Sequence, residues 1–390
     1  MIDFWILKDD CTACGACENI CPKSAIKIVS DNYGFSYPEI SANKCIDCGL
    51  CAQVCPIKNK YKKENIESEI YSAWSKNKDI RYNSTSGGMF SEIALEVIKN
   101  GGSVIGALYD SDNMIRHDVI EDEKGLEKIR QSKYAQSDIG LIFIEIKKLL
   151  DKGKRVAFCG APCQVAGLNS FLDKDYKNLL TIDFICRGVN SPKAYKAWLN
   201  QRESDYQAKA TKVWFKYKQF GWKNSPRCTR VDFNNGEVYV ANGKQNTFMS
   251  GYLGPNLYIR PSCGNCHFKG IQRQSDITLA DFWGIKKEYD DDLGTSLVML
   301  NSNKGTSVFN KIKGKIVFEP QNMSSIFAGN VCIDNSVEIN PKSKAFLKSL
   351  DDNPFDAMVL KYSTVPLYKS IINKGKRLLQ KTLVSIRKAI

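Results

Sequence analysis

Two runs of four cysteines near the N-terminus limit the possible folds of this chain more than any other feature. CTACGACENICP (11–22) and CIDCGLCAQVCP (45–56) share the spacing C-x2-C-x2-C-x3-C-P. In proteins with this spacing, three close cysteines bind one [4Fe-4S] cluster and the cysteine before proline binds a second one. The predicted ligand sets are therefore Cys11, Cys14, Cys17 and Cys55 for one cluster, and Cys45, Cys48, Cys51 and Cys21 for the other. The alternative, two structural zinc sites, normally shows cysteines in separate pairs.

The residues around these runs predict a small separate domain. AIKIVSDNYGFSYPEI (25–40) is typical of a β-hairpin with its turn at Asn32 to Gly34. KNKYKKENIESE (58–69) is densely charged and lacks glycine, which indicates a solvated linker. We expect a ferredoxin-type domain with two [4Fe-4S] clusters over residues 1–60, followed by a charged linker over 61–70.

Composition indicates a cytoplasmic metal-binding protein. Fifteen of the 390 residues are cysteines, and disulfides belong mainly to oxidising compartments and small domains. MIDFWILKDDC at the N-terminus does not resemble a secretory signal, and no run of eighteen apolar residues predicts a membrane-spanning helix. The formal net charge of +14 falls to about +10 with two clusters and about +8 with three. Such a basic surface suits an acidic electron carrier, an anionic cofactor or an anionic membrane face.

The remaining chain alternates between strand-like and helix-like segments, which predicts a larger mixed α/β domain. Predicted strands cover 70–75, 103–110, 115–122, 155–160 and 179–186, and predicted helices cover 89–102, 139–154, 162–172 and 191–203. Three further strand-like segments between 213 and 244 predict an antiparallel insertion.

Three loops next to these elements indicate a site. RYNSTSGGMF (81–90) precedes a helix, and its glycines would let a phosphate approach the helix N-terminus; the alternative is an ordinary helix cap. CGAPCQ (159–164) places Cys163 at a helix start, where a thiolate is stabilised. DFIC (183–186) places Cys186 at the end of a buried strand, where sites form in α/β sheets.

A separate Cys-x-x-Cys pair, Cys263 and Cys266, lies in RPSCGNCHFKG (260–270). Such a pair is typical of a redox disulfide or of half a zinc site, and it can also belong to a site assembled from distant segments. No short βαβ unit surrounds it, so a thioredoxin-type pair is not expected. The chain has only two histidines, which argues against a histidine-rich metal site.

Seven motifs follow one another in order over roughly residues 70–300. They are TSGGMF, SKYAQSDIG (132–140), FCGAPCQVAGL (158–168), DFICRGVNSP (183–192), KYKQFGW (216–222), RPSCGNCHFKG and SDITLADFWGI (275–285). Together they resemble the coenzyme F420 hydrogenase/dehydrogenase beta-subunit family, including members with a fused two-cluster ferredoxin module. The resemblance implies a domain that binds FAD and an iron–sulfur cluster over residues 71–345.

The resemblance also implies site residues. Candidate FAD contacts are Ser84, Thr85, Ser86, Gly87, Gly88, Ser132, Lys133 and Tyr134. Implied ligands of a third [4Fe-4S] cluster are Cys163, Cys186, Cys263 and Cys266, with zinc as the alternative metal. Lys133 is the candidate catalytic residue, in contact with flavin N5 or with a phosphate. Arg187 stands where the family often has histidine, and this fixed cation is expected to change the cluster potential or the substrate preference.

We expect an enzyme: an FAD and iron–sulfur oxidoreductase that passes electrons between [4Fe-4S] clusters and a flavin, with coenzyme F420 or another organic molecule as substrate. The alternative is a non-catalytic electron-transfer subunit of a larger hydrogenase or dehydrogenase complex. Expected partners are ferredoxin or such a subunit, together with a small-molecule substrate. Asp276 and Asp281 either orient the substrate or cap structure. VWFKYKQFGWK (213–223) interleaves aromatic and basic residues as single-strand nucleic-acid binders do, but we interpret it as a half-exposed strand and expect no nucleic acid.

The last predicted unit is a basic, amphipathic C-terminal tail over residues 346–390. Within it, LYKSIINKGKRLLQKTLVSIRKAI (367–390) carries periodic apolar residues. One interpretation is a helix packed on the body or on a partner, and the other is peripheral attachment to anionic lipid. Gly375 weakens the second interpretation, because glycine disfavours a continuous helix. The expected location is the cytoplasm, with membrane association through this tail as the alternative.

Overall fold

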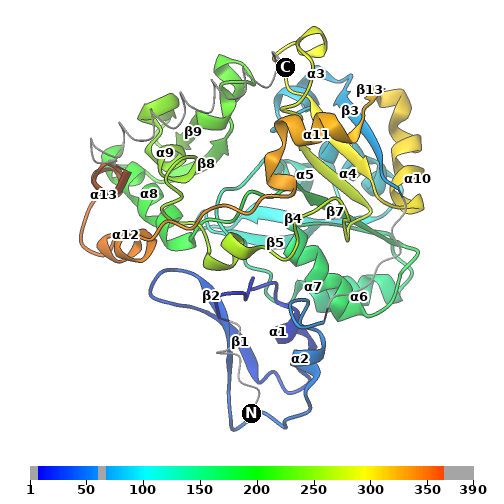
Figure 1. Cartoon of the computed structure of the whole chain (residues 1–390), viewed down its shortest axis with the longest axis horizontal. Helices are drawn as coiled ribbons and strands as arrows, with labels where there is room; N and C mark the ends of the chain where they lie inside the picture. The colour runs from blue at the N-terminus through cyan, green and yellow to red at the C-terminus, as the bar shows by residue number, and fades with distance from the viewer. Residues whose placement is uncertain (1–7, 60–66, 364–390) are drawn as a thin grey trace, which may run out of the picture.

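An eight-stranded mixed sheet forms the centre of the chain, for which a computed structural model describes residues 8–59 and 67–363 (Figure 1). The strand order is β13-β3-β12-β11-β7-β6-β4-β5. Its strands are β3 (Glu69–Ser75), β4 (Ser103–Tyr109), β5 (Ile115–Ile120), β6 (Val156–Cys159), β7 (Leu179–Phe184), β11 (Ile277–Asp281), β12 (Ser296–Leu300) and β13 (Ile316–Pro320). The pairs β4–β6, β6–β7 and β7–β11 are parallel, and the other pairs are antiparallel. The predicted mixed α/β architecture is confirmed.

Helices cover both faces of this sheet. On one face, α4 (Met89–Lys99), α5 (Glu123–Ile129) and α10 (Asn303–Ile312) share an apolar core with the sheet. On the other face lie α6 (Ile142–Asp151) and α7 (Pro162–Leu172). Strands β6 and β7 are almost wholly buried, as expected for parallel strands covered on both faces. Two shorter helices, α3 (Lys78–Tyr82) and α11 (Met323–Gly329), complete this part.

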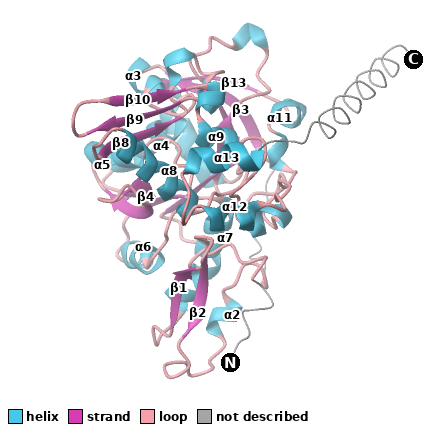
Figure 2. Cartoon of the chain, turned by 90° about the vertical axis from the view of Figure 1, so that its left-hand side faces the viewer, coloured by secondary structure: helices cyan, strands magenta, loops and turns pink. Residues whose placement is uncertain are grey.

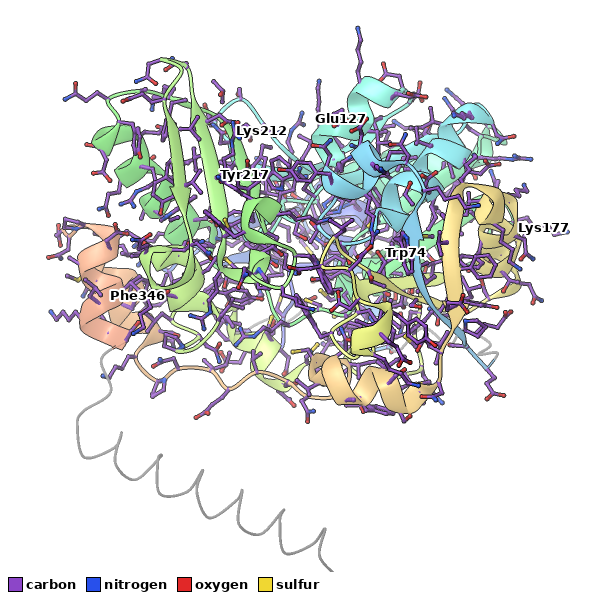
Figure 3. The ribbon with its side chains drawn as sticks, turned by 90° about the horizontal axis from the view of Figure 1, so that it is seen from above. Trp74, Glu127, Lys177, Lys212, Tyr217 and Phe346 are labelled. Carbon is purple, nitrogen blue, oxygen red and sulfur yellow. The ribbon has the colours of Figure 1, made fainter. Side chains whose placement is uncertain are left out.

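A second lobe is built on a three-stranded antiparallel sheet of order β10-β9-β8 (Figure 2). Its elements are β8 (Ala210–Phe215), β9 (Thr229–Phe233), β10 (Val238–Ala241), α8 (Pro192–Asp205), α9 (Thr247–Tyr252), α12 (Ser343–Ser349) and α13 (Phe355–Ser363). The predicted antiparallel insertion is confirmed. Residues 346–363 were assigned to the C-terminal tail, but Phe346 and Phe355 are buried in the core of this lobe. Figure 3 shows Lys212 and Tyr217 on this lobe and Trp74 on the side of the large sheet.

The N-terminal segment contains α1 (Ala16–Ile20), β1 (Ile26–Ser30), β2 (Ser36–Ile40) and α2 (Leu50–Gln53). Strands β1 and β2 form the predicted hairpin, and the segment lies beside α6 and α7 at one end of the molecule (Figures 1 and 2). Ala16 and Val54 belong to the apolar core of α6 and α7, while Phe35 packs into the core of the second lobe. The segment therefore contacts both parts of the body.

Two sequence predictions fall outside the described residues. Most of the predicted linker is among residues 60–66, and the amphipathic stretch 367–390 lies wholly beyond residue 363. Among the residues that the structure describes, no helix is long and apolar enough to cross a membrane.

Candidate functional site

The N-terminal cysteines form two groups in the structure. Burial, with smaller contributions from the nearby thiols of Cys11 and Cys55, raises the pKa of the Cys14 thiol to about 12. Burial also raises the pKa of Cys17 well above its usual value, with further contributions from the same group. Cys21, Cys45, Cys48 and Cys51 line one small hollow together. Cys55 and Cys21 thus each lie with the other run's cysteines, which is the exchange expected of two-cluster modules.

A cavity of about 600 Å³ lies where strands β6, β7 and β11 end against the second lobe. All four cysteines of the third set line it. Cys163 is the second residue of α7, and Cys186 follows β7. Cys263 and Cys266 lie at a short turn (Pro261–Asn265), which an isolated antiparallel bridge between Asn190 and Ile259 brings beside β7. Segments far apart in the sequence therefore meet at one place.

The four thiols of the third set lie close to one another, and all four cysteines are partly buried. Burial raises the pKa of Cys186 to about 12 and that of Cys163 well above its usual value. The thiols of Cys263 and Cys266 contribute to both increases, because ionising several close thiols is unfavourable. A bound cationic centre would remove this cost, since metal ligands bind as thiolates. The donor set therefore fits a metal centre.

A closed single-ion site does not appear among the described residues, where no group of three or more His, Cys, Asp or Glu side chains is close enough to hold one ion. A four-iron cluster distributes its thiolates over separate irons, so its ligands lie farther apart than those of one zinc ion. Zinc or a cluster at the third set stays a prediction that metal analysis decides.

The first cysteine group of the N-terminal module lies next to the third set. Gly167 of α7 faces Cys14 so closely that a Cβ atom on Gly167 would lie 2.8 Å from Cys14 Cβ and 2.9 Å from its Sγ. Cys163 is one helical turn earlier on the same helix, and the nearby Cys14 thiol contributes to the raised pKa of the Cys163 thiol. Helix α7 therefore brings the module and the cavity together.

The loop before α4 forms another wall of the cavity. Ser84, Thr85, Ser86 and Gly88 line it, together with Ser132, Lys133 and Tyr134. The Thr85 and Ser132 hydroxyls lie 3.1 Å apart, so the two predicted flavin segments touch each other. Gly87 does not line the cavity: its N–H donates to Ser296 Oγ at 3.0 Å, and a Cβ atom there would lie 2.4 Å from the Ala73 carbonyl oxygen. Gly87 instead permits tight packing of the loop against β3.

Lys133 and His117 lie deep in the cavity. The Lys133 ammonium donates to the carbonyl of Arg130 at 2.7 Å, and burial lowers its pKa to about 7. Burial also lowers the pKa of His117 to about 4, and its Nε2 lies 3.1 Å from the Cys159 carbonyl oxygen. Lys133 can therefore gain or lose a proton near neutral pH, whereas His117 is neutral there.

The cavity walls carry buried polar atoms that have no hydrogen-bond partner among the described residues. They are His117 Nδ1, Arg130 Nε, Asn190 Oδ1, Ser262 Oγ, Arg273 Nε and Asn330 Oδ1. Buried polar groups are normally paired with protein or water. Six such atoms around one cavity fit a polar organic ligand.

A buried ion pair, Lys216 and Asp281, was not predicted as a unit. Both residues line the cavity, and the Lys216 ammonium hydrogen-bonds to the Asp281 carboxylate. Lys216 is in a left-handed conformation with φ of 57°, which is strained for this residue type. Burial alone would lower its pKa, but the attraction of Asp281 raises it above the usual value. Lys216 stands in KYKQFGW, which was interpreted only as a strand and a family motif.

Trp283 forms the rim beside this pair and was also missed. It is 38% exposed, lines the cavity and stacks on the buried Trp222, with ring centroids 4.5 Å apart. Asp276, the other carboxylate considered in the sequence, does not line the cavity. It accepts hydrogen bonds from Thr181 and Ser302 and so holds the start of β11 in place.

Two parts of the chain each match the model of a known protein family. Residues 153–325 match the family model that describes the C terminus of the coenzyme F420 hydrogenase/dehydrogenase beta subunit. This part of the chain is similar to that family. Residues 10–59 match the model of a 4Fe-4S dicluster domain. The resemblance predicted from the sequence is confirmed, and the chain combines an iron–sulfur module with a beta-subunit-family domain, the composition of an electron-transfer oxidoreductase.

One solved structure is similar to this chain over most of its length. It is titled "Xenon derivatization of the F420-reducing [NiFe] hydrogenase complex from Methanosarcina barkeri". One of its chains is 16% identical, with 78% of this chain and 92% of that chain covered and a TM-score of 0.45. A search of curated proteins found no match.

Proposed function

We propose that this chain is an FAD- and iron–sulfur-dependent oxidoreductase that acts on coenzyme F420 or another organic substrate. One observation carries the proposal: a single cavity is lined both by the candidate flavin residues and by the four cysteines of the third set. Its volume of about 600 Å³ is within the range of small-molecule sites. A ligand in this cavity would share it with a metal centre at those cysteines.

The contact between α7 and the N-terminal module supports the transfer of electrons along the chain. Cys14 of the first cysteine group packs on Gly167, and Cys163 of the third set is one helical turn away. Two centres held at these positions would be separated by side chains in contact and by one turn of helix. The module is thus placed to exchange electrons with the cavity.

The walls of the cavity offer contacts for each part of FAD. Ser84, Thr85 and Ser132 present hydroxyls, and the loop leads into the N-terminus of the eleven-residue helix α4, which favours phosphate. The Lys133 ammonium provides a cation, and Tyr134 provides a ring wall. When bound, FAD supplies a centre that exchanges hydride with organic molecules and single electrons with clusters. The presence of the iron–sulfur module and the candidate FAD cavity in one chain thus supports an enzyme rather than a non-catalytic electron-transfer subunit.

The substrate side of the cavity is proposed at Lys216, Asp281 and Trp283. The ion pair presents a proton donor and an acceptor inside a buried space, and the exposed face of Trp283 offers a flat apolar wall for a ring. Asp281 keeps its orientation because the Trp222 Nε1–H donates to its second carboxylate oxygen at 3.4 Å. We propose that Asp281, held in this way, orients the substrate.

The proposal is tested by anaerobic purification with iron, sulfide, zinc and flavin analysis. Three clusters correspond to about twelve irons per chain and two to about eight. Cys263→Ala should lower the iron content by about four and leave the N-terminal clusters intact. Cys228→Ala is the matched control, because Cys228 is buried between Trp214 and Tyr217 and does not line the cavity. A Cys263→Ala protein that keeps all its iron contradicts the third cluster.

An acceptor screen separates the two functional alternatives. A purified chain that contains FAD and reduces a deazaflavin or an artificial acceptor supports the enzyme. Stable co-purification with other subunits, without turnover by the chain alone, supports the electron-transfer subunit. Liposome sedimentation of the full chain and of a chain lacking residues 367–390 tests membrane attachment.

A further inference from the structure

Arg260 is a buried arginine at the junction between the N-terminal module and the third cysteine set. It is 1% exposed, and its Nε donates to the Cys11 carbonyl oxygen at 2.9 Å. Its Nη1 donates to Gln136 Oε1 at 2.8 Å, and its Nη2 donates to the Ser36 carbonyl oxygen at 2.8 Å. All three nitrogens of the guanidinium are therefore used, and two of them bind the N-terminal module.

Among the described residues, no carboxylate pairs with Arg260: its hydrogen bonds go to two carbonyls and an amide, and none of the described ion pairs includes it. The guanidinium also faces the rings of Tyr37 and Phe35, at 4.6 and 5.8 Å from their centroids. Burying a cation without a negative partner is costly. A negative group that binds nearby would remove this cost.

Arg260 lies between two cysteine groups. On one side it binds the carbonyl of Cys11, and on the other its own carbonyl accepts the N–H of Cys263 at 3.0 Å. Gln136 adds a second link, because its Nε2 donates to the Thr12 carbonyl at 2.9 Å. A cluster with four thiolates carries net negative charge and becomes more negative on reduction. A buried cation between two such centres favours their reduced states.

We infer that Arg260 is a positioning residue that joins the first ferredoxin cysteine group to the third cysteine set, and that its charge raises the reduction potential of the clusters beside it. This inference rests on the proposed function for the identity of the clusters. Arg260 is the first residue of RPSCGNCHFKG, but its hydrogen bonds to Cys11 and Ser36 join segments that are distant in the sequence.

The test is a potentiometric titration of the clusters, followed by electron paramagnetic resonance, in Arg260→Gln and Arg260→Lys proteins. Arg260→Gln removes the charge, and we expect a roughly tenfold less favourable one-electron reduction, equal to about 59 mV towards negative potential. Arg260→Lys keeps the charge and should restore most of this shift. The control is Arg116→Gln, which removes a cation that is half exposed and paired with Asp118.

A third variant tests the charge without removing the arginine. Gln136→Glu places a carboxylate at the 2.8 Å contact with Arg260 Nη1, so it neutralises the cation in place. We expect a negative shift in the same direction, even if Arg260→Gln fails to load its clusters. Unchanged potentials in Gln136→Glu, or equal potentials in the Gln and Lys variants with wild-type iron content, would overturn the inference.

The two hypotheses fail in distinguishable ways. A wild-type chain with about eight irons contradicts the third cluster and so the proposed function, whereas the potential of the cluster at Cys11 still reports the charge of Arg260. A wild-type chain with about twelve irons, together with variants whose potentials do not move, contradicts only the role of Arg260.

Discussion

Gly167→Ala tests the contact by which electrons are proposed to enter the cavity. In the structure, the added Cβ atom would lie 2.8 Å from Cys14 Cβ, 2.9 Å from its Sγ and 3.3 Å from its carbonyl oxygen. Carbon atoms in favourable contact are about 3.5–4.0 Å apart. The substitution therefore requires Cys14 and α7 to separate by about 0.7 Å or more at this point.

The expected effect on stability follows from two opposing contributions. Replacing glycine by alanine inside a helix stabilises it by about 1 kcal/mol, whereas overpacking of a close contact costs about 1–3 kcal/mol. We therefore expect Gly167→Ala to lower the free energy of unfolding by about 1 kcal/mol. A larger effect should appear at the cluster, because Cys14 is a predicted ligand and must move.

The assay combines urea denaturation with anaerobic iron analysis and a rapid-mixing measurement of cavity reduction. Gly167→Ala should lose part of the iron of the first cluster, or keep the iron and transfer electrons to the cavity more slowly. Gly314→Ala is the control, because a Cβ atom at Gly314 meets no atom within 4 Å. A Gly167→Ala protein that is more stable than wild type, and that keeps its full iron content and the wild-type electron-transfer rate, would contradict the close contact between Gly167 and Cys14.

Two further predictions concern buried charges in the cavity. Burial lowers the pKa of Lys133 to about 7, so above that pH the Lys133 amine must take up a proton before it can bind the anionic phosphates of FAD. The affinity of the flavin-free protein for FAD should therefore be constant below about pH 7 and fall by up to tenfold per pH unit above it. Fluorescence titration should show no such fall in Lys133→Met, and an unchanged pH profile would place the phosphates elsewhere. Lys216→Met leaves the Asp281 carboxylate buried without its cation and should lower the free energy of unfolding by about 3–5 kcal/mol. Adding Asp281→Leu should restore most of that loss in urea denaturation, and a double variant no more stable than Lys216→Met would contradict it.

Local patterns predicted the elements whose cores are formed by their own periodic residues. Helices α4 and α6 place apolar residues on one face, and β6 and β7 are short apolar runs, so each element appears in its expected place. Strands β11 and β12 were not predicted. They lie in the middle of the large sheet, and β12 pairs with β3 across more than two hundred residues, as in Ser296 opposite Ala73. The local sequence of a strand does not identify a pairing partner that is so distant in the chain.

Residues 346–363 show why the assigned tail was partly misplaced. Residues 346–390 were interpreted as one basic, amphipathic tail, but Phe346 and Phe355 contribute rings to a core that also contains Tyr258 and Phe248. The net charge of a segment describes its exposed side chains. A few apolar residues at helical spacing are sufficient to bury the other face.

The residues of the candidate site could be predicted where they follow a characteristic sequence spacing. They could not be predicted where their role depends on contacts between segments that are distant in the sequence. The eight N-terminal cysteines follow from their spacing, and the four of the third set followed from the family resemblance. The fit of Gly167 against Cys14 and the pairing of Lys216 with Asp281 depend on elements that meet only after folding. Isolated glycines and lysines are common, so these positions had no signal of their own.

Exposure to solvent separates the group of Cys48 from the other two cysteine groups. Among the described cysteines, Cys48 alone is exposed, and its neighbour Ile46 is 57% exposed. Burial raises the pKa values of Cys14 and Cys17 in the next group, which packs on α7, and the third set lies under the second lobe. An external redox protein can approach the group of Cys48 most closely, whereas the cavity has room for a small organic molecule. Under the proposed function the chain therefore separates its two partners: single electrons are exchanged at the exposed end of the module, and the organic substrate is bound beside the third cysteine set.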